Sequence, residues 1–129
     1  MFCYTGVFSV CSMRGGVNVV RSVESSDKAL GLTREKIALN FGNDTRHDAF
    51  ATDAFEFMHN VKDEYHVIIL DPPAFAKHTK ALKNALQAYK RINTQAFTRI
   101  QKGGILFTFS CSQVVSREHF RQAVFSAAA

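Results

Sequence analysis

The stretch Tyr65-His66-Val67-Ile68-Ile69-Leu70-Asp71-Pro72-Pro73-Ala74-Phe75-Ala76-Lys77 decides the fold of this chain. Residues 67 to 70 form a continuous apolar run rich in β-branched side chains, which predicts a strand buried on both faces, as in a parallel sheet. Asp71 ends the run with a charge, and Pro72 and Pro73 cannot continue the hydrogen-bond ladder. The sequence therefore predicts a carboxylate on a stiff turn at the carboxyl edge of a sheet, where open α/β sheets bind ligands.

A second strand end of this kind follows later in the chain. The pair Gly103-Gly104 precedes a predicted strand over residues 105–109, which leads into Ser110-Cys111-Ser112. An isolated Asp-Pro-Pro would only end a strand. An acid and a thiol at the ends of two neighbouring strands are instead expected to form a chemical site, with Asp71 and Cys111 as its candidate catalytic residues.

Strand and helix patterns alternate along the rest of the chain. The predicted strands cover residues 17–24, 46–52, 67–70 and 105–109. The predicted helices cover residues 7–13, 28–40, 54–62, 79–101 and 117–128. The candidate residues for opening these helices are Thr5, Ser26 or Asp27, Asp53 and Ser116. This alternation predicts an α/β fold, a parallel sheet with helices on both faces and right-handed crossovers.

Composition restricts the class of protein. The 129 residues are enough for one domain or part of one, and 47% hydrophobic residues are enough for a core. No apolar run approaches the roughly 20 residues that span a membrane, and the first residues do not form a secretory signal. Three Cys predict a reducing, cytoplasmic location, and five His without metal-ligand spacing to Cys are expected to be surface or turn residues. We therefore expect no membrane and no metal.

The charge balance favours a polyanionic partner. The net charge is +5, and basic side chains follow the Asp-Pro-Pro turn at Lys77, His78, Lys80, Lys83, Lys90 and Arg91. A phosphate backbone lying over the strand ends would meet these side chains. A solvated basic face is the alternative interpretation.

Three features near the amino terminus indicate a nucleoside cofactor. The turn Phe2 to Val7 holds one glycine, Gly6, ahead of a predicted helix. The next strand ends at Glu24, where a carboxylate can accept both ribose hydroxyls, and Asp53 follows the predicted strand over residues 46–52, where it could bind an adenine amino group. No Gly-x-Gly-x-x-Gly is present, which favours S-adenosylmethionine over a dinucleotide. Taken singly, Glu24 is a solvated acid and Asp53 a helix cap.

Together these segments resemble the class I S-adenosylmethionine-dependent RNA cytosine-5 methyltransferases, in particular the bacterial branch that modifies large-subunit (23S) rRNA. The matching segments are FCYTGVFS, VESSDKAL, DAFEFM, DPPAFAK, YKRIN and GGILFTFSCSQ, in the order that the family has them. The resemblance covers nearly the whole chain and implies a Rossmann-like catalytic domain with S-adenosylmethionine as cofactor and rRNA as substrate.

The resemblance also implies residue roles. The cofactor site would comprise Tyr4, Thr5 and Gly6 at the methionine end, Glu24 with Ser25 at the ribose, Asp53 with Ala54 at the adenine, and Asp71. The target base would be bordered by Asp71, Pro72, Pro73, Phe75 and Lys77. Phe75 could equally be a core residue. Cys111 would be the nucleophile, whereas Cys3 and Cys11 are interpreted as small buried hydrophobic residues.

The chemistry explains the residue types. Carbon 5 of cytosine is a poor nucleophile until a thiolate adds to carbon 6. Asp71 could donate to the ring nitrogen if protonated, or accept from the exocyclic amine if ionised, and both options stay open. The base that removes the carbon-5 proton is not identified. The target base must be single-stranded or leave its stack to reach the site.

The chain also departs from the family pattern. Val7 stands where the family usually has glycine. The family's first strand and its last strands are missing, so that residues 1–129 are expected to be a partial domain, a truncated product with impaired activity. Two alternatives are an amino-group methyltransferase acting on adenine or protein, and a non-catalytic RNA-binding remnant. The first would leave Cys111 without a role. The oligomeric state stays open.

Overall fold

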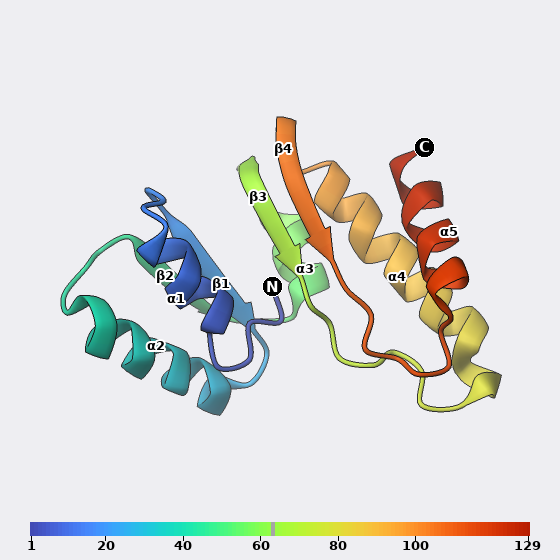
Figure 1. Ribbon diagram of the computed structural model, residues 1–129, viewed down its shortest axis with the longest axis horizontal. Helices are drawn as coiled ribbons and strands as arrows, with labels where there is room; N and C mark the ends of the chain where they lie inside the picture. Colours follow the sequence, from blue (N-terminus) through green and yellow to red (C-terminus); the bar gives the residue numbers. More distant parts are fainter. Residues whose placement is uncertain (63) are drawn as a thin grey trace. The chain divides into compact units, whose positions relative to one another are not determined.

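The computed structural model describes residues 1–62 and 64–129, which form two compact units, Met1–Phe57 and Met58–Ala129 (Figure 1). Each unit contains one pair of parallel strands, whereas the alternating pattern predicted one parallel sheet. The parallel α/β class is therefore confirmed, although the strands form two separate two-stranded sheets.

In the first unit, strand β1 (Val20–Glu24) pairs with strand β2 (His47–Ala51) in parallel. Helices α1 (Val7–Arg14) and α2 (Asp27–Phe41) both pack against β1. Ser26 caps α2 by accepting a hydrogen bond from the Ala29 N–H, as predicted. Helix α3 (Ala54–Asn60) follows β2, so that the turn after each strand of this sheet leads into a helix.

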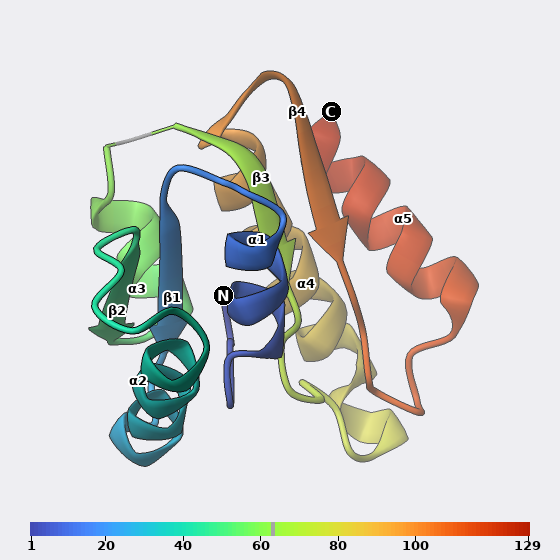
Figure 2. The same ribbon diagram turned by 60° about the vertical axis from the view of Figure 1, so that its left-hand side comes forward.

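In the second unit, strand β3 (Tyr65–Leu70) pairs in parallel with strand β4 (Ile100–Thr108). A 3-10 turn, η1 (Thr79–Ala81), leads into α4 (Leu82–Phe97), which packs against β4, and α5 (Arg117–Ala128) lies beside α4 (Figures 1 and 2). Tyr89 on α4 is fully buried at the centre of this unit. The residues clustered around it include Phe75, Ala76, Ala85, Val115, Phe120 and Ala123.

The predicted end of the long helix and start of the last strand are wrong. The helix ends at Phe97, and β4 begins at Ile100, ahead of Gly103-Gly104. Ile100 pairs with Tyr65, while the next pair joins Val67 to Ile105, so the two glycines lie in a bulge inside the strand. Helical spacing assigned Ile100 to the helix because an apolar residue fits either element, and only its pairing with β3 distinguishes the two.

Gly104 is required by close packing in this bulge. A Cβ at this position would lie 2.8 Å from the His66 carbonyl oxygen and 2.7 Å from the Ile100 side chain. We expect Gly104→Ala to lower the free energy of unfolding by about 2–4 kcal/mol, because the backbone contact cannot relax without disturbing the β3–β4 ladder. Gly31→Ala in α2 is the matched control: open space surrounds its Cβ position, and alanine is the better helix former by about 1 kcal/mol. Urea unfolding of both variants measures the difference, and equal stabilities would contradict a packing role for Gly104.

Burial on both faces, predicted for β3, is also wrong. Ile68 and Leu70 are buried, but Val67 is 49% exposed. On β4, Ile105 and Phe107 are also exposed, at 54% and 48%. Side chains alternate between the two faces of a strand, so the face that carries Val67 is the exposed one. Within residues 1–62 and 64–129, every helix is too short or too polar to be a membrane span.

Candidate functional site

In the first unit, the amino-terminal turn is fastened to the carboxyl end of β1. The Cys3 N–H donates to the Val23 carbonyl oxygen at 3.1 Å, and the Tyr4 N–H donates to Glu24 Oε2 at 3.0 Å. The Tyr4 carbonyl oxygen accepts from the Thr33 hydroxyl of α2 at 3.1 Å. The turn predicted to hold a cofactor is therefore anchored by Glu24, the residue predicted to hold its ribose.

The turn has an unusual backbone. Tyr4 adopts φ 46° and Gly6 φ 77°, both in the left-handed region, where a non-glycine residue such as Tyr4 carries strain. A Cβ at Gly6 would lie 2.4 Å from the Thr33 side chain, so glycine is needed there. Gly6, not the predicted Thr5, is the N-cap of α1, and no side chain caps this helix. The cap was mispredicted because the positive φ places glycine at the helix start.

Both predicted acids lie at one edge of the β1–β2 sheet. Glu24 pairs with Ala51, two residues before Asp53. Glu24 Oε1 accepts from the Ser26 N–H at 3.0 Å and from the Ser25 hydroxyl at 3.3 Å. Asp53 Oδ1 accepts from the N–H groups of Phe55 (2.9 Å) and Glu56 (3.1 Å), so it caps α3. The helix-cap interpretation of Asp53 holds, and the buried Ala54 follows it.

In the second unit, the thiol and the acid follow adjacent strands. The Phe109 N–H donates to the Leu70 carbonyl oxygen at 2.9 Å, which continues the β3–β4 pairing up to the Asp-Pro-Pro turn. Pro72 is buried, whereas Asp71 and Cys111 are exposed. Cys111 Sγ lies 3.5 Å from the Pro72 carbonyl oxygen. The two predicted strand ends therefore lie next to each other, with the sulfur against the turn that carries the carboxylate, while a meeting of the sulfur with the Asp71 carboxylate itself stays a prediction.

Two hydroxyl groups hold the loop that carries Cys111. The Ser112 hydroxyl, on a buried residue, donates to the Ala76 carbonyl oxygen and so ties this loop to the segment after Asp71. The Ser110 hydroxyl donates to the phenolic oxygen of the buried Tyr89 at 2.9 Å. The Tyr89 ring contacts Phe75 at 4.7 Å between centroids, so Phe75 lies against the core cluster. Sequence patterns did not identify these supports, because a serine beside a cysteine carries no signal of its partner.

We expect Ser112→Ala to lower the free energy of unfolding by about 1–3 kcal/mol, because it leaves the Ala76 carbonyl oxygen without this donor in a buried place. Ser126→Ala is the control, since this exposed serine in α5 donates to the Ala123 carbonyl oxygen of its own helix, and the change should be within about 0.5 kcal/mol. Urea unfolding compares the two. Equal values would show that the Ser112–Ala76 bond does not hold the loops together.

The other two thiols differ from Cys111 in their surroundings. Cys3 is partly buried, and this burial raises the pKa of its thiol, which keeps the sulfur protonated and weakly nucleophilic. Cys11 is exposed on α1, so its predicted burial is wrong. Helical spacing placed Cys11 on an apolar face, but residues of α1 on that side reach solvent.

Among the described residues, no cluster of His, Cys, Asp and Glu could hold a metal ion.

His47 was predicted as a surface or turn residue and lies instead on β2, half-buried. Its Nε2 is 2.7 Å from the Ser22 hydroxyl, which is 2.7 Å from the hydroxyl of Ser9 on α1. Burial lowers the pKa of the His47 imidazole, so the ring is neutral at physiological pH. This buried chain of polar groups joins α1 to both strands of its sheet.

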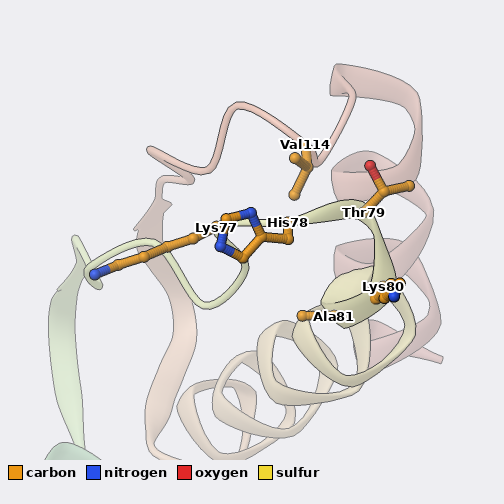
Figure 3. Close-up of a pocket in the computed structure, with 6 residues that line it drawn as sticks. All are labelled: Lys77, His78, Thr79, Lys80, Ala81 and Val114. Atoms are coloured by element: carbon orange, nitrogen blue, oxygen red, sulfur yellow. The ribbon is translucent and has the colours of Figure 1, made fainter.

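A cleft of about 710 Å³ adjoins the Cys111 loop (Figure 3). Its lining residues are Lys77, His78, Thr79, Lys80, Ala81 and Val114. Lys77 and its basic neighbours were singled out by charge, whereas Thr79 and Val114 were not.

The chain is similar to ribosomal RNA large subunit methyltransferases I over nearly its whole length. It is 39% identical over 131 residues to the enzyme of Aeromonas hydrophila and 35% identical over 130 residues to that of Shigella dysenteriae. Each match covers 98% of this chain and 33% of the relative, so the chain spans about a third of the length of these curated relatives. No family model matches the chain.

Solved structures share its fold. SMU.776, assigned as a methyltransferase and solved in complex with SAH, superposes with a TM-score of 0.85 at 20% identity, over 98% of this chain and 34% of that one. The SAM-dependent methyltransferase of Agrobacterium tumefaciens superposes with a TM-score of 0.71 at 22% identity, over 95% of this chain and 42% of that one. The chain therefore has the Rossmann-like α/β fold that these methyltransferase structures have over the matched part of their length.

Proposed function

We propose that residues 1–129 are part of the catalytic domain of an S-adenosylmethionine-dependent methyltransferase that transfers a methyl group to carbon 5 of a cytosine in rRNA. One observation carries the proposal: an exposed thiol, Cys111, contacts the Asp-Pro-Pro turn at the carboxyl ends of two parallel strands. The similarity to rRNA methyltransferases supports RNA as the substrate. Methylation of rRNA by this protein would take place in the cytoplasm.

The first unit fits a nucleoside cofactor without phosphates. Its turn offers one glycine, Gly6, and a carboxylate, Glu24, at the same strand end. A phosphate would be repelled by Glu24, whereas a ribose diol can donate two hydrogen bonds to that carboxylate. We assign Glu24 with Ser25 to the ribose, Tyr4, Thr5 and Gly6 to the methionine end, and Asp53 with Ala54 to the adenine. S-adenosylmethionine would supply the electrophilic methyl group. Val7, which stands where the family usually has glycine, is 60% exposed.

The second unit would act on the base. Cys111, as a thiolate, adds to carbon 6 of cytosine, and the new C–S bond pushes electron density onto carbon 5. Asp71, which we also assign to the cofactor, interacts with the polar edge of the ring, where charge develops. Carbon 5 would then take the methyl group and S-adenosylhomocysteine would leave, after which loss of the carbon-5 proton to a base and cleavage of the bond between Cys111 and carbon 6 would release Cys111. Pro72, Pro73, Phe75 and Lys77 would border the base.

Product analysis tests the proposal. The chain is incubated with S-adenosylmethionine, labelled in the methyl group, and rRNA, beside a relative of full length as the positive control. Digestion to nucleosides and mass spectrometry should show 5-methylcytidine. Label on the exocyclic amine of adenine or on protein would support an amino-group methyltransferase instead. Retention of RNA without S-adenosylmethionine binding or methyl transfer would indicate a non-catalytic RNA-binding protein.

A further inference from the structure

We propose that the cleft lined by Lys77, His78, Thr79, Lys80, Ala81 and Val114, called here the basic cleft, binds one nucleotide of single-stranded RNA next to the target cytosine. This inference rests on the proposed function, since it names where the strand that enters the Cys111 site continues. Every charged or polar side chain of the lining can donate a hydrogen bond: two ammonium groups, a hydroxyl and an imidazole. Such a set suits phosphate oxygens, which only accept.

The charge of the chain is concentrated in the unit that contains the cleft. Met58–Ala129 carries ten Lys and Arg against four Asp and Glu, a net charge of +6, whereas Met1–Phe57 carries six against seven, a net charge of −1. The sequence from Pro72 to Arg117 contains no acidic residue. A polyanion is therefore attracted to the second unit, and the basic cleft is a concave place on it whose lining includes two lysines.

The size of the cleft fits more than a phosphate ion. About 710 Å³ lies in the range of small-molecule sites, and Ala81 and Val114 supply apolar surface for a sugar or base. Figure 3 shows Val114 across the cleft from Ala81, with His78 between them, while the Lys77 side chain extends away toward the loop that follows β3. A strand bound in the cleft would thus meet Lys77 on its way to the Asp-Pro-Pro turn.

The basic cleft and the Cys111 site share the same two loops. Lys77 follows Ala76, whose carbonyl oxygen accepts from the Ser112 hydroxyl, and Val114 lies two residues beyond Ser112. This bond holds the two walls of the cleft at a fixed position relative to Cys111. An RNA nucleotide in the cleft would therefore fix the register of the strand and so select which base reaches the thiol.

Salt-dependent RNA binding tests this inference without any methyl transfer. The 129-residue chain is titrated into a short fluorescein-labelled single-stranded RNA at several salt concentrations. We expect Lys80→Ala to weaken binding severalfold and to reduce the slope of log K against log salt by about 0.7, the value for one lost phosphate contact on a single strand. Lys102→Ala removes the same charge from an exposed position on β4 and should change neither quantity.

A second measurement distinguishes RNA from small phosphates. In two-dimensional NMR spectra, RNA should shift the His78 imidazole signals and those of the Val114 methyl groups, while inorganic phosphate or AMP at the same concentration should not. Equal shifts by AMP would overturn the assignment to an RNA strand, as would equal slopes for Lys80→Ala and wild type. If Lys80→Ala loses RNA affinity but wild type makes no 5-methylcytidine, the cleft assignment stands and the proposed reaction fails.

Discussion

Replacing Cys111 with alanine should reduce methyl transfer to RNA by at least about three orders of magnitude while leaving S-adenosylmethionine affinity unchanged. The thiolate is the only group in the proposed reaction that forms a bond to carbon 6, and without that bond carbon 5 does not become nucleophilic. Cys111 lies in the second unit, whereas the residues assigned to the cofactor, apart from Asp71, lie in the first. A fall in both activity and cofactor affinity would therefore contradict a purely nucleophilic role.

The covalent step can be trapped as an independent check. RNA that contains 5-fluorocytosine cannot lose a proton from carbon 5, so the C–S bond to the nucleophile persists and the protein migrates more slowly in a denaturing gel. We expect the adduct with wild type and with Cys11→Ala, and none with Cys111→Ala. Cys11 is the matched control because its thiol is also exposed. An adduct that survives in Cys111→Ala and disappears in Cys3→Ala would assign the nucleophile to Cys3.

Local sequence signals predicted the order of elements and the place of the thiol. The apolar run before Asp71 and the caps at Ser26 and Asp53 are short-range features, and the structure has each of them where the sequence indicated. The approach of Cys111 to the Asp-Pro-Pro turn also followed from sequence, because parallel neighbouring strands bring their carboxyl ends to one edge.

What the sequence did not reveal depends on contacts between distant residues. The bulge at Gly103-Gly104 exists because β3 pairs with Ile100 and then with Ile105, a register that no local pattern specifies. Tyr89 lies within the predicted helix over residues 79–101, but the hydrogen bond that it accepts from Ser110 was not predicted. The exposure of Val67 likewise depends on what packs against the sheet, which a strand's own composition does not determine.

Glu24 is the residue of the first unit with the largest expected effect. We expect Glu24→Gln to weaken binding of S-adenosylhomocysteine by about 10- to 100-fold, since hydrogen bonds to a charged acceptor contribute about 1.5–3 kcal/mol each and the amide keeps only one oxygen. Glu24→Ala should weaken it further, because the Tyr4 and Ser26 N–H groups both lose their acceptor, whereas the amide oxygen of Gln still accepts from one of them.

Titration calorimetry of both variants with S-adenosylhomocysteine measures this series. Glu35→Gln removes the same charge from an exposed position on α2 and should bind as wild type does, which separates a contact at the ribose from the general loss of negative charge. If the Gln variant binds normally and only the Ala variant is weak, Glu24 acts by holding the amino-terminal turn and not by contacting the ribose. Because Oε2 accepts from Tyr4 and Oε1 from Ser26, the Gln variant keeps one of these bonds and the Ala variant neither, so the gap between the two variants measures how much of cofactor affinity depends on that remaining anchor of the turn.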